Sequence, residues 1–238
     1  MADSGCSPPR VNSIVVNSCD NAHCARGGPP GRLVNVHQMN FLDHVLLGVR
    51  DLKAAADRLH REWGLGTVPG GTPVPGVANV IVPLAPPVYL ELVAATDPGA
   101  SEAAERLAAF TAAGDRLFTW AMEPDGLDAR AAGSGMVPVS GGGDTGRWRL
   151  LGEVEQGRPF FIEYDIARAG RIEGWRRAYD EAAHDCAPGR VTYLEVGGDE
   201  SELRQWVGEV DVPLRMVGGE PRLAAAGIAT ARGEILLR

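Results

Sequence analysis

The chain lacks an excess of positive charge and any long apolar segment. Its 238 residues carry 23 basic and 31 acidic side chains, a formal net charge of −8 at pH 7. This balance argues against nucleic acid and anionic membranes as partners. No apolar run reaches the roughly 20 residues of a membrane helix, and the first residues lack the basic start and apolar core of a secretion signal. We therefore expect a cytoplasmic protein.

Cysteines are nearly missing from the body of the chain. Three of the four, Cys6, Cys19 and Cys24, lie in the first 24 residues, and only Cys186 follows. A disulfide framework needs partners spread through the fold, so none is expected. Cys19, His23 and Cys24 could be imagined as metal ligands, but the second half of a zinc site, with its usual paired spacing, is missing.

The signatures of a nucleophilic serine and of a nucleotide site are also missing. There is no Gly-x-Ser-x-Gly elbow and no phosphate-loop lysine. Gly141, Gly143 and Gly146 have the spacing of a dinucleotide fingerprint, but that motif needs a helix directly afterwards. The residues that follow, 147–150, are strand-like. We expect a hairpin loop here and no nucleotide cofactor.

Residues 1–38 contain much Gly, Pro, Ser and Asn and little periodic apolar sequence. This composition predicts a disordered N-terminal extension, placed before a fold that begins near Met39. Its removal is expected to leave folding intact.

The rest of the chain, with 45% hydrophobic residues overall, can bury a substantial core. One pattern occurs three times in it: an apolar strand, a turn containing Asp, an amphipathic helix and further strands. The three units are residues 39–98, 115–168 and 190–238. An internal period of this size predicts an α+β fold built from repeated strand-helix-strand-strand-strand modules.

The three units can be aligned on their turn aspartates. The distance from the opening strand to the closing strand is then nearly equal in all three, although a chance alternation of helices and strands could produce the same spacing. The aligned residues are Asp51, Asp125 and Asp199 in the turns, His44, Phe118 and Thr192 in the opening strands, and Glu91, Glu163 and Leu237 in the closing strands.

Two closing strands carry a carboxylate in the middle of an apolar run. Strand alternation places Glu91 on the same face as Tyr89, and Glu163 on the same face as Phe161. A buried, unpaired glutamate is costly, so each must meet solvent, a cation or a metal. His44 could join them if its strand neighbours that of Glu91.

The opening LDHVLLGVRDLKAAA, the Gly/Pro loop ending in GVAN and the closing YLELVA resemble the glyoxalase-like branch of the vicinal-oxygen-chelate superfamily. The first unit matches well, and the second and third match in pattern more than in letters. The resemblance implies two modules whose mixed, curved sheets enclose a half-open cleft. It also implies a divalent metal, held by the first and last strands of both modules.

Carried over by position, the resemblance implies His44, Glu91 and Glu163 as metal ligands. The fourth place falls on Phe118, which cannot ligate. One His and two carboxylates suit Mn²⁺, Fe²⁺, Ni²⁺ or Zn²⁺. Glu91 or Glu163, once released from the metal, could act as the catalytic base.

The expected cleft wall combines aromatic and polar side chains, which suits a small organic molecule with a carbonyl, enol or phenolic oxygen. Trp120 and Trp148 are equally compatible with a core position. The candidate ligand-binding residues are Asn79, Tyr89, Trp120, Trp148, Arg149 and Phe161.

Two functions remain open at this point. One is a metal-dependent lyase, isomerase or dioxygenase that chelates two adjacent substrate oxygens. The other is a binding protein without turnover, such as a drug-sequestering resistance protein. In the plainest alternative, His44 is a hydrogen-bonded strand histidine, and the two glutamates pair with Arg149 or Arg158. The third module, non-catalytic and unpaired, predicts a homodimer.

Overall fold

The computed structural model describes residues 39–143 and 146–238. The predicted extension 1–38 lies outside this range, as does the metal-site interpretation of its cysteines and His23. Among the described residues no helix is both long and apolar enough to cross a membrane.

The first unit has the predicted order of elements. Its helix begins and ends at recognisable signals: the Asp51 side chain accepts a hydrogen bond from the Ala54 amide at 2.9 Å, and Gly64 ends the helix in the left-handed region, with φ 71°. The elements are β1 (Met39–Gly48), α1 (Leu52–Trp63), β2 (Val68–Pro69), β3 (Val77–Pro83) and β4 (Tyr89–Ala95).

The second unit follows a linker and repeats the order of the first. Its β6 and β7 form an antiparallel hairpin around Gly141 and Gly143, so the glycine run is a hairpin, as predicted. The linker contains η1 (Pro98–Ala100) and α2 (Glu102–Thr111); the unit contains β5 (Arg116–Glu123), α3 (Leu127–Ser134), β6 (Val139–Gly143), β7 (Gly146–Leu151) and β8 (Phe160–Tyr164).

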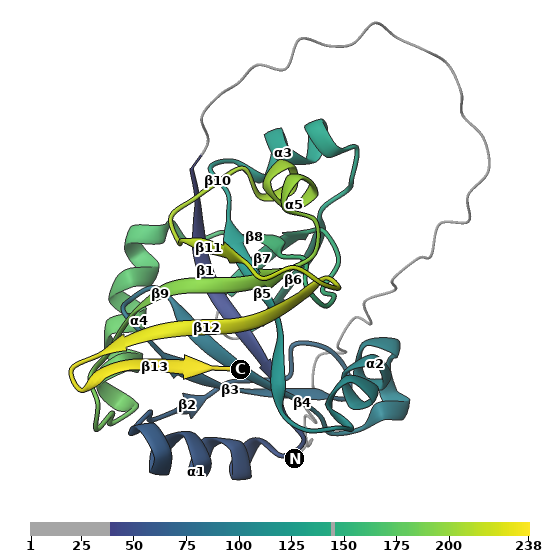
Figure 1. The fold of residues 1–238 in the computed structure, drawn as a ribbon. Coiled ribbons are helices and arrows are strands. Elements are labelled where there is room, and N and C mark those ends of the chain that lie inside the picture. Colours follow the sequence, from purple (N-terminus) through teal and green to yellow (C-terminus); the bar gives the residue numbers. More distant parts are fainter. Residues whose placement is uncertain (1–38, 144–145) are drawn as a thin grey trace, which may run out of the picture. The chain divides into compact units, whose positions relative to one another are not determined.

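The two units join edge to edge in one mixed sheet (Figure 1). The strand order is β2-β3-β4-β1-β5-β8-β7-β6. In each unit the opening and closing strands are parallel neighbours, β1 with β4 and β5 with β8, and β1 pairs with β5 antiparallel. The predicted α+β fold with a mixed, curled sheet is confirmed.

The last part of the chain forms a second sheet with a different pairing. Its order is β11-β9-β12-β13, in which the opening strand β9 runs parallel to β11 and antiparallel to β12. The closing strand β13 pairs with β12 rather than with the opening strand, so the third unit does not repeat the pairing of the first two. Its elements are β9 (Pro188–Gly197), α5 (Glu200–Val207), β10 (Glu209–Val210), β11 (Leu214–Met216), β12 (Arg222–Thr230) and β13 (Gly233–Leu237).

The second sheet packs on one face of the first. Trp120 and Phe161 from the large sheet and Leu194 and Ile228 from the small one belong to a single buried cluster, and each is at most 1% exposed. One face of the third unit is thus covered within the chain. This packing gives no structural reason for the homodimer, which stays a prediction.

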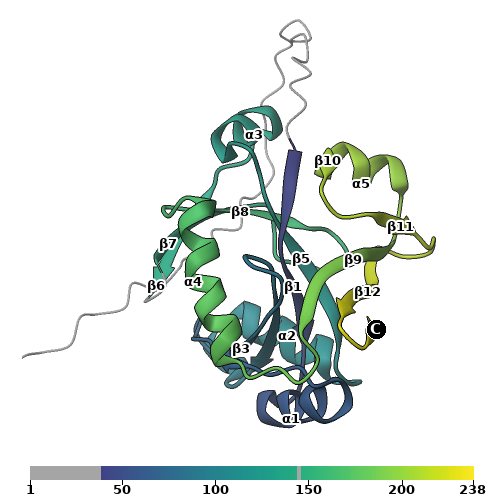
Figure 2. The ribbon, with the colours of Figure 1, turned by 90° about the vertical axis from the view of Figure 1, so that its left-hand side faces the viewer.

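Helix α4 (Arg168–Glu181) lies over the other face of the large sheet (Figure 2). It is poorly built as a helix. Ala167 at its N-cap makes no side-chain hydrogen bond, its first turn carries no acidic residue, and its sole buried residue is Arg171. It also contains Gly170 and Gly174, each of which costs about 1 kcal/mol relative to alanine inside a helix.

Candidate functional site

The site is built around Asp43 and His44, two consecutive residues of β1. The pairing of β1 with β5 shifts register between Leu42 and His44, which marks a β-bulge. Asp43 is 0% and His44 2% exposed. The bulge allows the two side chains to meet, and Oδ1 of Asp43 lies 2.7 Å from Nδ1 of His44.

Asp43 is held by three donors. Besides His44, the Tyr164 hydroxyl donates to its Oδ1 at 2.8 Å and Nη1 of Arg171 donates to its Oδ2 at 2.9 Å. Burial alone would raise the pKa of Asp43, but the hydrogen bond with His44 and the charge of Arg171 outweigh burial, and the pKa lies below its usual value. Asp43 is therefore an ionised carboxylate that orients the imidazole.

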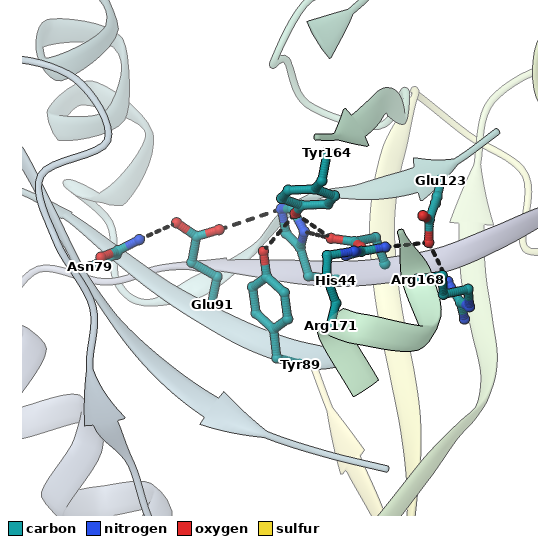
Figure 3. A network of polar contacts seen from close by, with 9 residues as sticks. His44, Asn79, Tyr89, Glu91, Glu123, Tyr164, Arg168 and Arg171 are labelled. Atoms are coloured by element: carbon teal, nitrogen blue, oxygen red, sulfur yellow. Dashed lines mark hydrogen bonds and ion pairs between the residues drawn. The ribbon is translucent and has the colours of Figure 1, made fainter. Parts of the chain in front are cut away.

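The other edge of the imidazole faces Glu91. Nε2 of His44 lies 3.4 Å from Oε2 of Glu91, and the Asn79 amide donates to Oε1 of Glu91 at 2.6 Å. Strand β4 places Glu91 there because it runs parallel to β1, with Leu46 opposite Glu91. Figure 3 shows the resulting chain of polar contacts from Asn79 through Glu91 to His44.

This arrangement limits where protons can lie. Because Asp43 is ionised, we assign the hydrogen on Nδ1 of His44 to the bond with Asp43. Nε2 and the Glu91 carboxylate are then two basic atoms facing each other at 3.4 Å. They are compatible when one of the two groups carries a proton. The pair can accordingly give or take a proton, as general acid-base chemistry requires.

Aromatic rings surround the imidazole. The Tyr89 ring stacks on His44 at 4.6 Å and on Trp175 of α4 at 4.5 Å, and Phe160 approaches His44 edge-on at 5.7 Å. Burial raises the pKa values of Tyr89 and Tyr164 well above the usual value, and the nearby charge of Asp43 raises both further. Both phenols stay neutral at physiological pH and can donate hydrogen bonds.

Ion pairs connect α4 to the same site. Arg168 and Arg171 both contact Oε2 of Glu123 at 2.5 Å, and Arg171 also binds Asp43. The Arg171 guanidinium lies 4.0 Å from the Tyr164 ring centroid. The ion pairs that attach α4 to the sheet thus include Asp43, the residue that orients His44.

Comparison with known proteins adds the family. Residues 42–207, more than half of the chain, match the family described as glyoxalase-like domain. The chain belongs to this glyoxalase-like family. It is thereby a member of the vicinal-oxygen-chelate superfamily, as the sequence resemblance implied. A search of curated proteins found no match.

One of the similar solved structures shares the fold of this chain. A hypothetical protein from Staphylococcus aureus matches with a TM-score of 0.56 and 11% identity, over 78% of this chain and 88% of that chain. Methylmalonyl-CoA epimerase from Mycobacterium tuberculosis matches with a TM-score of 0.41 and 23% identity, over 53% of this chain and 87% of that chain. A methylmalonyl-CoA epimerase in complex with methylmalonyl-CoA and NH4+ matches with a TM-score of 0.42 and 18% identity, over 55% of this chain and 98% of that chain. At these values only the first bears on the fold.

Glu163 does not join His44 and Glu91 in the glyoxalase-like sheet. Its carboxylate binds the Arg149 guanidinium and receives the Leu127 amide of α3 at 3.4 Å, and Arg149 also binds Asp128 at 2.7 Å. Residues that alternate with Glu163 along β8, such as Tyr164, face His44 instead. The expected grouping of Glu163 with the metal ligands, and of Arg149 with the ligand, is corrected by this geometry.

The start of α3 explains why Phe118 was expected at the position that corresponds to His44. Its N-cap is Gly126, which makes no side-chain hydrogen bond, whereas α1 starts at Asp51. Alignment on Asp125 therefore placed every earlier position of the second unit one residue out. Counted from Gly126, the residue equivalent to His44 is Thr119.

The counterparts of the first unit's ligands are then neutral. Thr119 donates its hydroxyl hydrogen to the Arg158 carbonyl at 2.7 Å. Ala121 pairs with Phe160 as Leu46 pairs with Glu91, so Phe160 holds the place of the second carboxylate. Phe118, which was expected at the position corresponding to His44, packs instead on Phe110 of α2, with the ring centroids 4.8 Å apart.

The other predicted ligand-binding residues divide between the two faces. Asn79 and Tyr89 lie at the site, and Trp148 is partly buried beside Tyr164, its partner across β7 and β8. Trp120 and Phe161 are fully buried in the core beneath the second sheet.

The donor set does not fit a resident divalent cation. Proteins hold such ions with about three or more side-chain ligands. Next to Nε2 of His44 the remaining charged donor is Glu91, because Asp43 lies on the other side of the imidazole and is bonded to Nδ1 of His44 and to Arg171. Within residues 39–143 and 146–238 no group of three or more His, Cys, Asp or Glu side chains could hold a metal. Thr119 and Phe160 stand where the second module would supply the others.

Sequence reasoning missed Asp43, Tyr164, Arg171 and Trp175. Asp43 stands beside His44, but strict alternation assigns it to the opposite face, and the bulge is not encoded by any glycine. Tyr164 was assigned to the face away from Glu163, which is the face that carries the site. Arg171 and Trp175 belong to α4, which lies between the second and third units; its Trp and several Arg are a usable signal.

Proposed function

We propose that this glyoxalase-like protein binds a small organic molecule with a carbonyl, enol or phenolic oxygen next to His44, and that His44 and Glu91 move a proton to or from it. The observation that carries the proposal is the buried chain Asn79, Glu91, His44, Asp43 on one face of the sheet. A buried pair of basic groups that is oriented on both sides suits proton transfer better than a structural role.

Each residue has a part in the proposed reaction. Asp43 holds the imidazole with Nε2 towards the ligand, and Asn79 holds Glu91. A proton on Nε2 or on Glu91 can pass to a ligand oxygen, while the other, basic group takes a proton from an adjacent carbon. This is isomerase or lyase chemistry that proceeds through an enol, and the neutral Tyr89 hydroxyl could donate to the enol oxygen.

A second candidate is binding without turnover, as in a drug-sequestering resistance protein. The aromatic rings of Tyr89, Phe160 and Trp175 around the imidazole favour it, because stacking on them would hold a ligand without chemistry. In D₂O the enzyme would exchange a carbon-bound hydrogen of its bound ligand, whereas the binding protein would leave it untouched.

The site can be tested with ligand-observed NMR on a set of small ketones, aldehydes and phenols. Compounds that bind the wild type are expected to lose affinity about 10- to 100-fold in His44→Gln and Glu91→Gln, which is the effect of removing a hydrogen bond to a charged group.

Glu163→Gln is the matched control, because Glu163 pairs with Arg149 on the opposite face. Its affinities should equal those of the wild type. If Glu163→Gln weakens binding as much as Glu91→Gln does, or if His44→Gln has no effect, the proposal fails.

A further inference from the structure

Asn79 lies between the site and the exposed loop 69–73. On one side its amide nitrogen donates to Oε1 of Glu91 at 2.6 Å. On the other side the Gly71 amide donates to Oδ1 of Asn79, and the main-chain N–H of Asn79 donates to the Gly71 carbonyl at 3.0 Å. All residues of this loop are exposed. A surface loop is therefore bonded to the residue at the end of the polar chain in Figure 3.

These contacts fix which end of the Asn79 amide faces Glu91. A backbone N–H can only donate, so the atom that faces Gly71 must be the amide oxygen. The amide nitrogen must then face Glu91, and it too can only donate. Oε1 of Glu91 is thereby kept as an acceptor. A proton carried by Glu91 belongs on Oε2, the oxygen that lies 3.4 Å from Nε2 of His44.

The contact between the loop and Asn79 requires a glycine at position 70. Neither Gly70 nor Gly71 has a positive φ, so the backbone conformation does not demand glycine at either position. A Cβ at Gly70 would nevertheless overlap Oδ1 of Asn79 and lie 2.6 Å from its carbonyl oxygen. A Cβ at Gly71 would meet no described atom within 4 Å. The absence of a side chain at Gly70 thus allows the loop to approach Asn79.

We propose that Gly70 and the main-chain amide of Gly71 are positioning groups of the proton site: through the Asn79 amide they keep the proton of Glu91 on Oε2. The presence of a transferable proton rests on the proposed function, whereas the contacts of the loop do not depend on it. The loop acts without touching a ligand. Because Oε1 is occupied by Asn79, Oε2 is the oxygen that exchanges a proton with His44 or with a ligand.

The loop contact can be measured in the free protein by NMR of the Asn79 side-chain amide, whose signal is the one missing from Asn79→Asp. Gly70→Ala forces the loop and Asn79 apart. The hydrogens on Nδ2 should then exchange with water at least tenfold faster than in the wild type, as expected when a hydrogen bond to a charged group is lost. Gly71→Ala is the matched variant, because it keeps the N–H and adds its Cβ in open space. Its exchange rate should stay within about twofold of the wild type, the factor that corresponds to a few tenths of a kcal/mol.

The imidazole of His44 separates a positioning role from a merely structural one. In protein with ¹⁵N-labelled histidine at pH 7, Glu91→Gln gives the Nε2 resonance without the carboxylate. Gly70→Ala should move the Nε2 resonance in the same direction. The Nδ1 resonance should move less, because Asp43 stays in place. Gly71→Ala should leave both resonances at their wild-type positions.

Asn79→Asp is a second variant that carries the test if Gly70→Ala does not fold, as thermal melts will show. It keeps an acceptor for the Gly71 amide but loses the donor to Glu91, so it too should move the Nε2 resonance. An unchanged Nε2 resonance in the folded variants, an unchanged Asn79 exchange rate in Gly70→Ala, or equal changes in Gly71→Ala would overturn the proposal. If the resonances move as expected but Glu91→Gln binds every ketone, aldehyde and phenol as the wild type does, the proposed function fails while the positioning by the loop stands.

Discussion

Replacing Asp43 by Asn is expected to lower the free energy of unfolding by about 3–5 kcal/mol, the usual cost of removing one member of a buried ion pair. Asn keeps the shape of the side chain but removes the charge that faces Arg171 and His44. Arg171 would keep Glu123 as a partner, so the lower end of that range is expected. Urea denaturation at pH 7 measures the change.

The same variant should change the pH dependence of stability. The pKa of Asp43 is lowered in the folded protein, so its ionised form stabilises the fold above the unfolded value of about 3.9. This contribution is lost as the pH falls through the lower folded pKa. The wild type should lose stability over that acid range, and Asp43→Asn should lack this part of the loss.

Asp128→Asn is a suitable control, because Asp128 also pairs with an arginine but its side chain is 78% exposed. Its stability should change far less than that of Asp43→Asn. Equal effects of the two substitutions would show that the buried network does not stabilise the fold as described.

Trp120→Ala is expected to lower the free energy of unfolding by about 3–5 kcal/mol, as for other large-to-small core substitutions. Trp120 is 0% exposed and lies among the residues between the two sheets. Its Nε1 has no hydrogen-bond partner among the described residues. Trp120→Phe therefore removes no hydrogen bond and should cost less than Trp120→Ala, because it leaves a smaller cavity.

Denaturation and ligand binding together decide between a core role and a ligand-binding role for Trp120. A core role predicts that Trp120→Phe binds ligands as the wild type does. Weaker ligand binding by Trp120→Phe with unchanged stability would instead indicate a ligand-binding role, which its buried position in the core does not predict.

The sequence was sufficient for the fold class and for half of the site. The alternation in β4 gave the face of Glu91, and the resemblance to the glyoxalase-like family grouped His44 with it; in the structure these two residues and Asn79 lie together. The second module could not be aligned in the same way, because its helix starts at a glycine without a capping side chain. An error of an odd number of residues exchanges the two faces of a strand, and Glu163 lies three residues after Phe160, the position that corresponds to Glu91.

Other parts of the site depend on contacts between distant segments. The bulge at Asp43 is defined by how β1 pairs with β5, and α4 reaches the site from more than 120 residues further along the chain, as in the bond from Arg171 to Asp43. The pairing of β9 with β12 rather than with β13 joins segments that are not consecutive strands of the chain. None of these is visible in the periodicity of one segment.

Strand β1 is hydrogen-bonded to parts of all three units. It pairs with β4 and β5 along its length, and its first residues pair with β10, where the Asp211 carboxylate also accepts the Leu42 amide at 2.6 Å. No unit can detach without breaking bonds next to His44. The chain should accordingly unfold in one cooperative step, and its halves should not be separable into independently folding fragments.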